Sequence, residues 1–213
     1  LDADTMPWHL VNTAFRTFVW EPAPWGKRVA GDEELAKDPS FVGKAIQDIF
    51  WDNPRLAILT EGSCVWSKAR NPYVFFPDTV QTVLATAPVD IQLSASRHVA
   101  LLRRGVLAQD IKMLWAQKAQ FRIHSNQEPF KQDTVEAPRS TSYEFAEQSD
   151  PCPVASSLYF AAEPGDYATI RDMTIIDSKR RLEVFASEIA WTGVLAAATP
   201  LTTVRCLTIT WLV

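Results

Sequence analysis

Glycine is scarce in this chain, with 7 glycines among 213 residues against 14 prolines. No two glycines lie closer together than Gly26 and Gly31. Dinucleotide-binding and phosphate-binding loops need clustered glycines, because backbone N–H groups must approach an anion closely. Gly26 precedes a lysine, but Glu21 stands where a phosphate-binding loop needs its first glycine. The sequence therefore lacks both nucleotide-binding motifs, and it contains no G-x-S-x-G, H-E-x-x-H or C-x-x-C motif.

Cysteine and histidine are scarce as well, with three residues of each. Cys64, Cys152 and Cys206 are widely spaced and odd in number, which argues against a disulfide framework and favours a reducing compartment. The histidines show no zinc-ligand spacing. We therefore expect a cytoplasmic protein with no cofactor and no bound metal. Cys64 follows a predicted strand, and we expect a buried thiol there rather than a nucleophile.

Charge and hydropathy exclude two further classes. A net charge of −4 argues against coating of nucleic acid, although a local basic patch remains compatible with it. The apolar stretch 191–213 contains Pro200, Arg205 and six threonines, which argue against a membrane-spanning helix. No charged segment precedes an apolar one in the pattern of a signal peptide. We expect a soluble protein with no membrane partner.

The hydrophobic periodicity predicts an α+β fold: a mixed or antiparallel sheet with three to five helices, in one compact domain with a long acidic, proline-containing loop. Helical spacing of apolar residues predicts helices at 39–50, 78–87, 97–120 and 180–198. In the last of these, Leu182, Val184 and Ala186 also alternate as in a strand, and the helix is preferred because glutamates and alanines accompany them. Short apolar or alternating runs predict strands at 56–59, 73–76, 158–162, 167–176 and 202–213.

Three parts follow one another along the predicted domain. Residues 1–124 form a Trp-rich α/β part that ends in a basic amphipathic helix at 97–124. Residues 125–155 hold six acidic side chains and four prolines and are expected to form an acidic loop or linker. Residues 156–213 form a β-rich C-terminal part. Together they are expected to make one domain.

The stretch 97–124 concentrates positive charge. It carries six basic residues against Asp110, a net charge of +5, which leaves −9 for the remaining chain. Such asymmetry fits an anionic partner, a solvated helix face, or neutralisation by the acidic loop of the same chain. The candidate binding residues are Arg97, Arg103, Arg104, Lys112, Lys118 and Arg122.

Asp166 and Asp177 are candidates for metal-assisted phosphodiester cleavage, with Lys179 beside them. Two carboxylates on adjacent strands can hold Mg²⁺ while a lysine polarises the attacking water. The predicted element order of 97–213 resembles that of restriction-endonuclease-like folds. The same residue types are also common in the turns of a hairpin.

Eight tryptophans are the strongest compositional feature. Trp suits both cores and interfaces, and Trp and Arg are enriched where proteins bind each other. Glycine poverty also disfavours the tight loops on which many active sites are built. We therefore expect an association or assembly protein, a homo-oligomer or a protein with a protein partner, with an anionic partner as a further option. The alternatives are the metal-dependent nuclease and a cofactor-free small-molecule enzyme with a Trp-lined pocket.

Overall fold

The computed structural model describes residues 1, 5–95, 98–99, 101–108, 111–125, 129–154, 157–162, 169–174 and 187–189. These residues form seventeen strands, and no helix occurs among them. The α+β prediction is therefore wrong, and the described part of the chain is all-β. The strands are β1 (Trp8–Ala14), β2 (Thr17–Pro22), β3 (Ile46–Asp52), β4 (Arg55–Thr60), β5 (Ser63–Trp66), β6 (Val89–Gln92), β7 (Ser94–Ala95), β8 (His98–Val99), β9 (Leu102–Ala108), β10 (Ile111–Ala116), β11 (Ala119–Ser125), β12 (Val135–Glu136), β13 (Arg139–Thr141), β14 (Cys152–Val154), β15 (Ser157–Ala162), β16 (Thr169–Thr174) and β17 (Ser187–Ile189).

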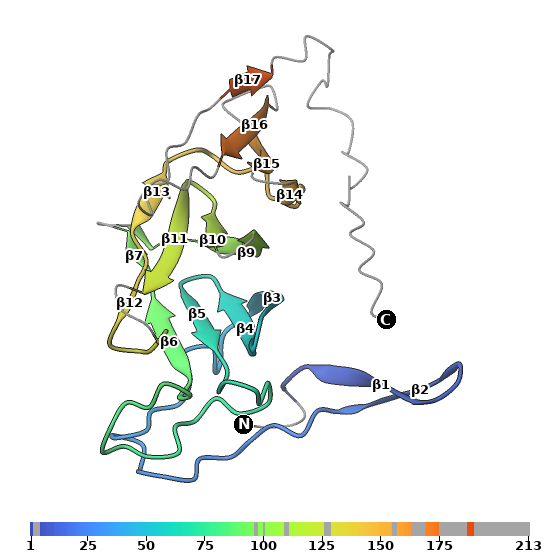
Figure 1. The fold of residues 1–213 in the computed structure, drawn as a ribbon, viewed down its shortest axis with the longest axis vertical. Helices are drawn as coiled ribbons and strands as arrows, with labels where there is room; N and C mark the ends of the chain where they lie inside the picture. The colour runs from blue at the N-terminus through green and yellow to red at the C-terminus, as the bar shows by residue number, and fades with distance from the viewer. Residues whose placement is uncertain are drawn as a thin grey trace.

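The strands form antiparallel sheets in which neighbours in the sequence are mostly neighbours in space. Strands β3–β6 form the first sheet, β9–β13 the second and β14–β17 the third, while β1 pairs only with β2 and β7 only with β8. Short connections suffice between antiparallel strands, which explains this order. Figure 1 shows the three larger sheets following one another along the long axis, with the β1–β2 hairpin projecting sideways from the lower end.

The second sheet is buried on both faces. In β10, Leu114 and Ala116 face a core shared with the first sheet, whereas Met113 and Trp115 face a core shared with the third. Successive side chains of a strand point to opposite faces, so one strand serves two cores. Trp66 and Trp115, both fully buried, are the largest side chains of these two cores.

Irregular chain covers the outer face of the first sheet. Ile58 of β4 and Val65 of β5 point outward and pack against Met6, Phe41 and Phe75. The last two rings meet edge to face, with their centroids 5.1 Å apart. The two loops that contain Phe41 and Phe75 thus pack on the outer face of the first sheet through aromatic contacts and add no strand to it.

The predicted basic helix at 97–124 is the clearest error. Its described residues form β8, β9, β10 and β11, and a two-residue turn at Gln117 and Lys118 joins the last two strands. Leu107, Ile111 and Leu114 recur at helical spacing because they come from successive hairpin strands. The turn carries no glycine, asparagine or aspartate, so the usual hairpin signal is missing.

The other helix predictions also fail where the structure describes them. Residues 40–44 form turns and 46–52 form β3, because the strand pairs with β4 and sets Ile49 opposite Ile58. The predicted helix at 78–87 is bends and turns. Within 180–198 the described residues are those of β17, and the rest lie outside the described part of the chain.

Three strand predictions are confirmed: 56–59 lies in β4, 158–162 in β15, and 167–176 contains β16. The predicted strand at 73–76 is a turn and irregular chain, and 202–213 lies outside the described residues. The acidic segment 125–155 is more ordered than a loop, because β12, β13 and β14 fall within it. The division of the chain at 124 and 155 stays a prediction.

Candidate assembly surface

The most exposed apolar feature is the hairpin of β1 and β2, residues 8–22, which we call the arm (Figure 1). Every residue of β2 is exposed, and so are five of the seven residues of β1. Apolar side chains dominate the arm, with Leu10, Phe18 and Trp20 each between 57% and 61% exposed. A hairpin of two strands is marginally stable in water, and contiguous exposed apolar surface marks interaction sites.

The two faces of the arm differ in chemistry. Leu10 lies opposite Trp20 and Asn12 opposite Phe18, and cross-strand partners share a face. With Trp8, whose indole stacks on that of Trp20 at 6.4 Å, they make one mainly apolar face. The opposite face carries Val11, Val19, His9 and Glu21.

The base of the arm is fixed to the body by polar contacts. His9 Nδ1 on β1 lies 3.0 Å from the hydroxyl of Tyr73 on the body, whereas its Nε2 lies 3.3 Å from Glu21 Oε1 within the arm itself. Trp25 Nε1 donates to the carbonyl of Pro7 at 3.1 Å, and its ring meets Tyr73 edge to face. These contacts fix the direction in which the arm leaves the body.

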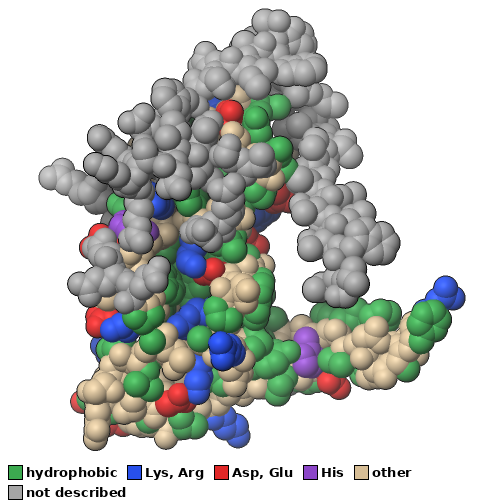
Figure 2. Space-filling model, viewed as in Figure 1, with side chains coloured by type: hydrophobic (Ala, Val, Ile, Leu, Met, Phe, Trp, Pro, Cys, Tyr) green, Lys and Arg blue, Asp and Glu red, His purple; other side chains and the backbone are tan. Residues whose placement is uncertain are grey.

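The tip of the arm carries Phe15 and Arg16. Phe15 is 87% exposed, and the Arg16 guanidinium lies over its ring, 5.1 Å from the centroid. Arg16 adopts a left-handed backbone with φ of 61°, a conformation that non-glycine residues adopt infrequently. The turn therefore presents an aromatic ring and a positive charge together at the far end of the arm, where Figure 2 shows a hydrophobic and a basic side chain next to each other.

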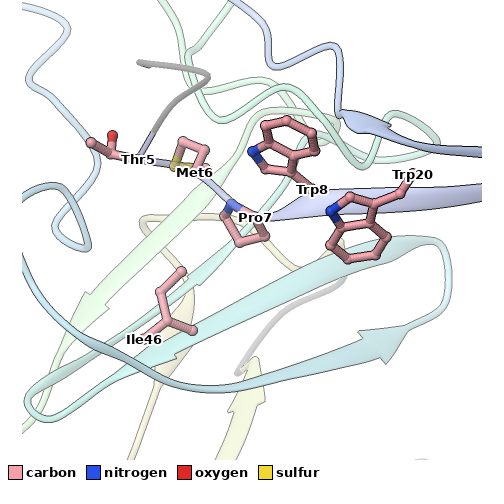
Figure 3. Close-up of a pocket in the computed structure, with 6 residues that line it drawn as sticks. All are labelled: Thr5, Met6, Pro7, Trp8, Trp20 and Ile46. Atoms are coloured by element: carbon pink, nitrogen blue, oxygen red, sulfur yellow. The ribbon is translucent and has the colours of Figure 1, made fainter.

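A shallow hollow of about 400 Å³ lies between the arm and the first sheet. Figure 3 shows Trp8 and Trp20 side by side on the arm, with Ile46 across the hollow at the start of β3. None of the lining side chains is titratable, so this Trp-lined hollow offers no general acid or base. The lining residues are Thr5, Met6, Pro7, Trp8, Trp20 and Ile46.

A second hollow, of about 530 Å³, lies among the loops that cover the first sheet, and we call it the groove. Segments 34–40 and 77–83 form its walls, and Leu35, Val80 and Val83 give it exposed apolar surface. Three acids and one lysine line it as well, which makes it net negative. These charged residues are Glu34, Asp38, Asp90 and Lys37.

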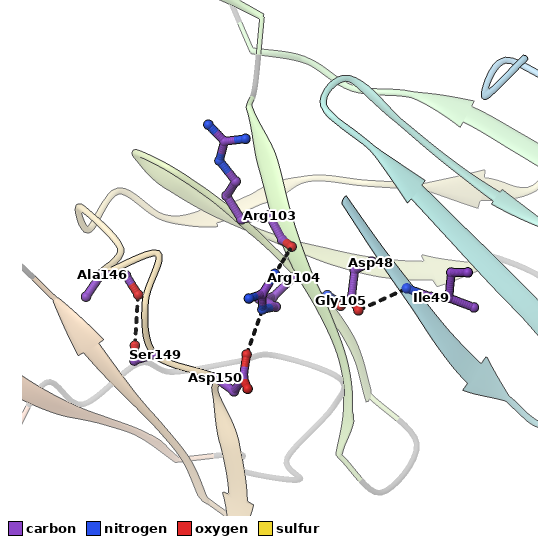
Figure 4. Close-up of polar contacts among 8 residues, drawn as sticks. All are labelled: Asp48, Ile49, Arg103, Arg104, Gly105, Ala146, Ser149 and Asp150. Carbon is purple, nitrogen blue, oxygen red and sulfur yellow. Dashed lines mark hydrogen bonds and ion pairs between the residues drawn. The ribbon is translucent and has the colours of Figure 1, made fainter. Parts of the chain in front are cut away.

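The predicted basic residues that the structure describes do not share a helix face, because they lie on β9, β10 and β11 and in the turn between the last two. Arg103 of β9 forms an ion pair with Glu147 at 3.0 Å. Its neighbour Arg104 pairs with Asp150 at 2.6 Å, as Figure 4 shows, and both acids come from the acidic segment. Arg103 Nη1 also bonds Gln47 of β3 at 3.0 Å. The intramolecular alternative, in which the acidic segment neutralises these side chains, agrees with this geometry.

The remaining basic candidates are also engaged or lie elsewhere. Lys112 of β10 pairs with the buried Asp52 at 2.7 Å, and Lys118 lies 3.7 Å from Glu144. Arg122 on β11 has interactions within the chain, and Arg97 lies outside the described residues. Binding of an external anion by this set stays a prediction.

Asp48 joins the first sheet to the second. Its Oδ2 accepts the backbone N–H of Gly105 in β9 at 2.9 Å, and its Oδ1 accepts the N–H of Ile49 at 2.9 Å (Figure 4). Burial raises the pKa of the Asp48 carboxyl, and the two N–H donors oppose that shift only in part. The carboxylate is a joint between sheets rather than a catalytic group.

The residues proposed for metal-assisted catalysis, Asp166, Asp177 and Lys179, lie outside the described part of the chain. Among the residues that are described, no three His, Cys, Asp or Glu side chains are grouped as metal ligands would be. Cys64 is fully buried, and burial raises the pKa of its thiol well above the ordinary value, so it is a poor nucleophile. Over the same residues, no helix has the length and apolarity to cross a membrane.

The sequence analysis did not predict the arm, although strand-forming residues are present in it. Residues 17–20 are β-branched or aromatic, and 8–11 hold a tryptophan, a leucine and a valine. Phe15 and Arg16 give no turn signal, because a tight hairpin turn usually carries glycine, asparagine or aspartate.

The described residues form successive antiparallel sheets with a projecting apolar arm, an arrangement suited to association with other protein surfaces. Residues 1–185 match the bacteriophage nozzle protein family. The chain therefore belongs to the bacteriophage nozzle protein family, a family of structural proteins of the phage tail. The expectation of an association or assembly protein is confirmed at this level.

A curated relative carries a matching name. The tail tubular protein gp12 of Escherichia phage T7 is 26% identical to this chain over 167 residues. That alignment covers 78% of this chain and 21% of the relative, so the chain spans about a fifth of the length of that protein.

Proposed function

We propose that this chain is a structural subunit of the phage tail that associates with copies of itself and contacts other tail proteins. In this proposal the subunit is made and assembled in the host cytoplasm and becomes part of the virion. The observation that carries the proposal is the family match over residues 1–185. The exposed arm supports it, because contiguous apolar side chains on a projecting hairpin suit a partner surface better than water.

The energetics of the arm favour association. Six large apolar side chains on 15 residues are exposed, and burying apolar surface stabilises a complex by roughly 25 cal/mol per Å² before the cost of association is subtracted. Tryptophan and phenylalanine lose few rotamers when they bind, so they contribute strongly at interfaces. These side chains are Trp8, Leu10, Phe15, Phe18, Val19 and Trp20.

Neither enzyme alternative gains support. The Trp-lined hollow holds no titratable group, and the buried Cys64 has no activated thiolate. The candidate carboxylates of the nuclease hypothesis lie outside the described residues. We therefore propose a structural role alone.

The experiment is light scattering behind size exclusion, on the full chain at low and at high salt. We expect a discrete oligomer that persists at high salt, because the exposed arm is mainly apolar and salt weakens only its charged contacts. A monomer at both salt concentrations, at protein concentrations well above the micromolar range typical of weak complexes, would contradict the proposal.

A further inference from the structure

We propose, building on the proposed self-association, that the arm tip of one copy inserts into the groove of the next copy. Phe15 enters the apolar part of the groove, and Arg16 meets its acidic rim. The contact is head-to-tail, because the arm and the groove are different surfaces of the same chain.

The tip has the chemistry of an anchor. Phe15 is the most exposed large apolar side chain of the described residues. Arg16 stacks on its ring and has no carboxylate partner within the described part of the chain. An aromatic ring beside an unpaired guanidinium is the combination that dominates binding hot spots.

The groove has the complementary chemistry. Its exposed Leu35, Val80 and Val83 are apolar, and its volume of about 530 Å³ exceeds what one aromatic ring needs. Glu34 on the wall forms no ion pair among the described residues, whereas the neighbouring Asp38 is held by Arg28 at 2.7 Å. Glu34 is therefore the carboxylate available to an incoming Arg16.

The placement of the two surfaces excludes contact within one molecule. Figure 1 shows the arm on one side of the lower end and the loops of the groove, in blue and green, on the other side. The seven residues of β1, at about 3.4 Å each, extend the arm by about 24 Å away from its own groove. The same contact repeated from copy to copy closes into a ring when the rotation between copies allows it.

The occupant is a second copy because the chain carries both complementary surfaces. The tip is positive and apolar, and the groove is negative and apolar. Docking also orders a two-stranded arm that is marginal by itself.

The first test measures self-association of the full chain by light scattering over a concentration series. We expect Phe15→Ala to raise the apparent Kd at least about tenfold, as truncation of a hot-spot aromatic does. Val154→Ala, which also removes an exposed apolar side chain but on β14, is the matched control and should leave the Kd unchanged. Arg16→Glu should weaken association, and Glu34→Arg in the same chain should restore it.

The second test uses disulfide trapping in a Cys152→Ser, Cys206→Ser background, where the buried Cys64 remains. The pair Thr17→Cys with Gln81→Cys should give a ladder of linked oligomers on oxidation, whereas the control pair Thr17→Cys with Gln148→Cys should not. A disulfide-linked dimer from Thr17→Cys alone would indicate tip-to-tip contact and overturn the inference.

The outcomes separate this inference from the proposed function. If the unaltered chain assembles and the tip and groove variants assemble equally well, the inference is wrong and the structural role stands. The arm then serves another tail protein. If the unaltered chain stays monomeric, the proposed self-association fails, and this inference fails with it.

Discussion

Single residues join the sheets of this protein through buried charge. The carboxylate of Asp52, 4% exposed, accepts a bond from Lys112 Nζ at 2.7 Å, and the Lys112 ammonium lies 5.1 Å from the centroid of the Phe130 ring. Beside them the buried Arg55 donates to three backbone carbonyls, at Ser67, Ala85 and Ala87. A buried charge is costly without its partner, so these contacts specify how β3 and β10 meet.

Lys112→Met should lower the free energy of unfolding by about 2–3 kcal/mol, because it leaves the buried Asp52 carboxylate with Arg55 as its nearby cation. Asp52→Asn in the same chain removes the unpaired carboxylate charge. The free energy of unfolding of the double variant should therefore fall by less than the sum of the losses of the two single variants. Urea unfolding of all four proteins measures this coupling. Strict additivity would mean that the ion pair contributes nothing.

Asp48 should make stability depend on pH. Its pKa in the folded chain lies above the ordinary value of 3.8, so the folded state binds more protons between those two pKa values. The free energy of unfolding should therefore fall as pH rises through that window and stay lower above it. Arg104 and Asp150 are the charged groups nearby, with opposite and smaller effects on this pKa.

Asp48→Asn keeps an oxygen that can accept the Gly105 N–H but removes the titration. We expect a flatter stability profile from the ordinary pKa of 3.8 up to neutrality, and stability at neutral pH equal to or above that of the unaltered chain. Urea unfolding across this pH range provides the measurement. A loss above about 1 kcal/mol at neutral pH would show that the charge of the carboxylate is needed for its hydrogen bonds.

At the scale of elements, the joint between β3 and β9 depends on close approach. The ring of Phe50 in β3 lies against the Cα of Gly105 in β9, where a Cβ would overlap it. Gly105 does not have a positive φ, so the requirement is space rather than backbone conformation. This explains one of the few glycines in the chain, because Gly105 allows two sheets to touch.

Gly105→Ala should destabilise the chain by about 1–3 kcal/mol, because the added methyl group displaces a packed aromatic ring. Phe50→Leu in the same chain should recover part of the loss, since it vacates the ring position. Thermal and urea unfolding of the single and double variants measure both effects. If Gly105→Ala alone leaves the free energy of unfolding unchanged, β3 and β9 can move apart at this contact without cost.

For the whole molecule, sequence reasoning located β4, β15 and β16 but missed the buried strands β5, β10 and β11. The apolar run at 56–59 was readable because a strand buried on both faces is continuously apolar. The stretch 107–115 was misread because apolar residues of successive hairpin strands recur at helical spacing. Asp110 stands between them in the sequence and is a turn-forming residue type, but without a neighbouring glycine it gives only a weak hairpin signal. Ionic contacts such as Arg104 with Asp150 join positions 46 residues apart, which no local pattern encodes.

The sequence analysis predicted the residue types of the candidate site but not their positions in the chain. Tryptophan and arginine were expected at an interface, and Trp8, Trp20 and Arg16 are exposed on the arm. The arginines that were named, Arg103 and Arg104, are held by the chain's own acids instead. Exposure depends on the whole fold, and composition does not distinguish a tryptophan in a core from one on a projecting hairpin.

The two-faced strand β10 also fixes the alignment of the molecule. A slip of one residue would exchange Leu114 and Ala116 with Met113 and Trp115, and each core would receive side chains of the wrong volume. Because the first and third sheets both pack against side chains of this strand, the register of β10 sets the position of one sheet relative to the other. Only a slip by whole residues could change that position.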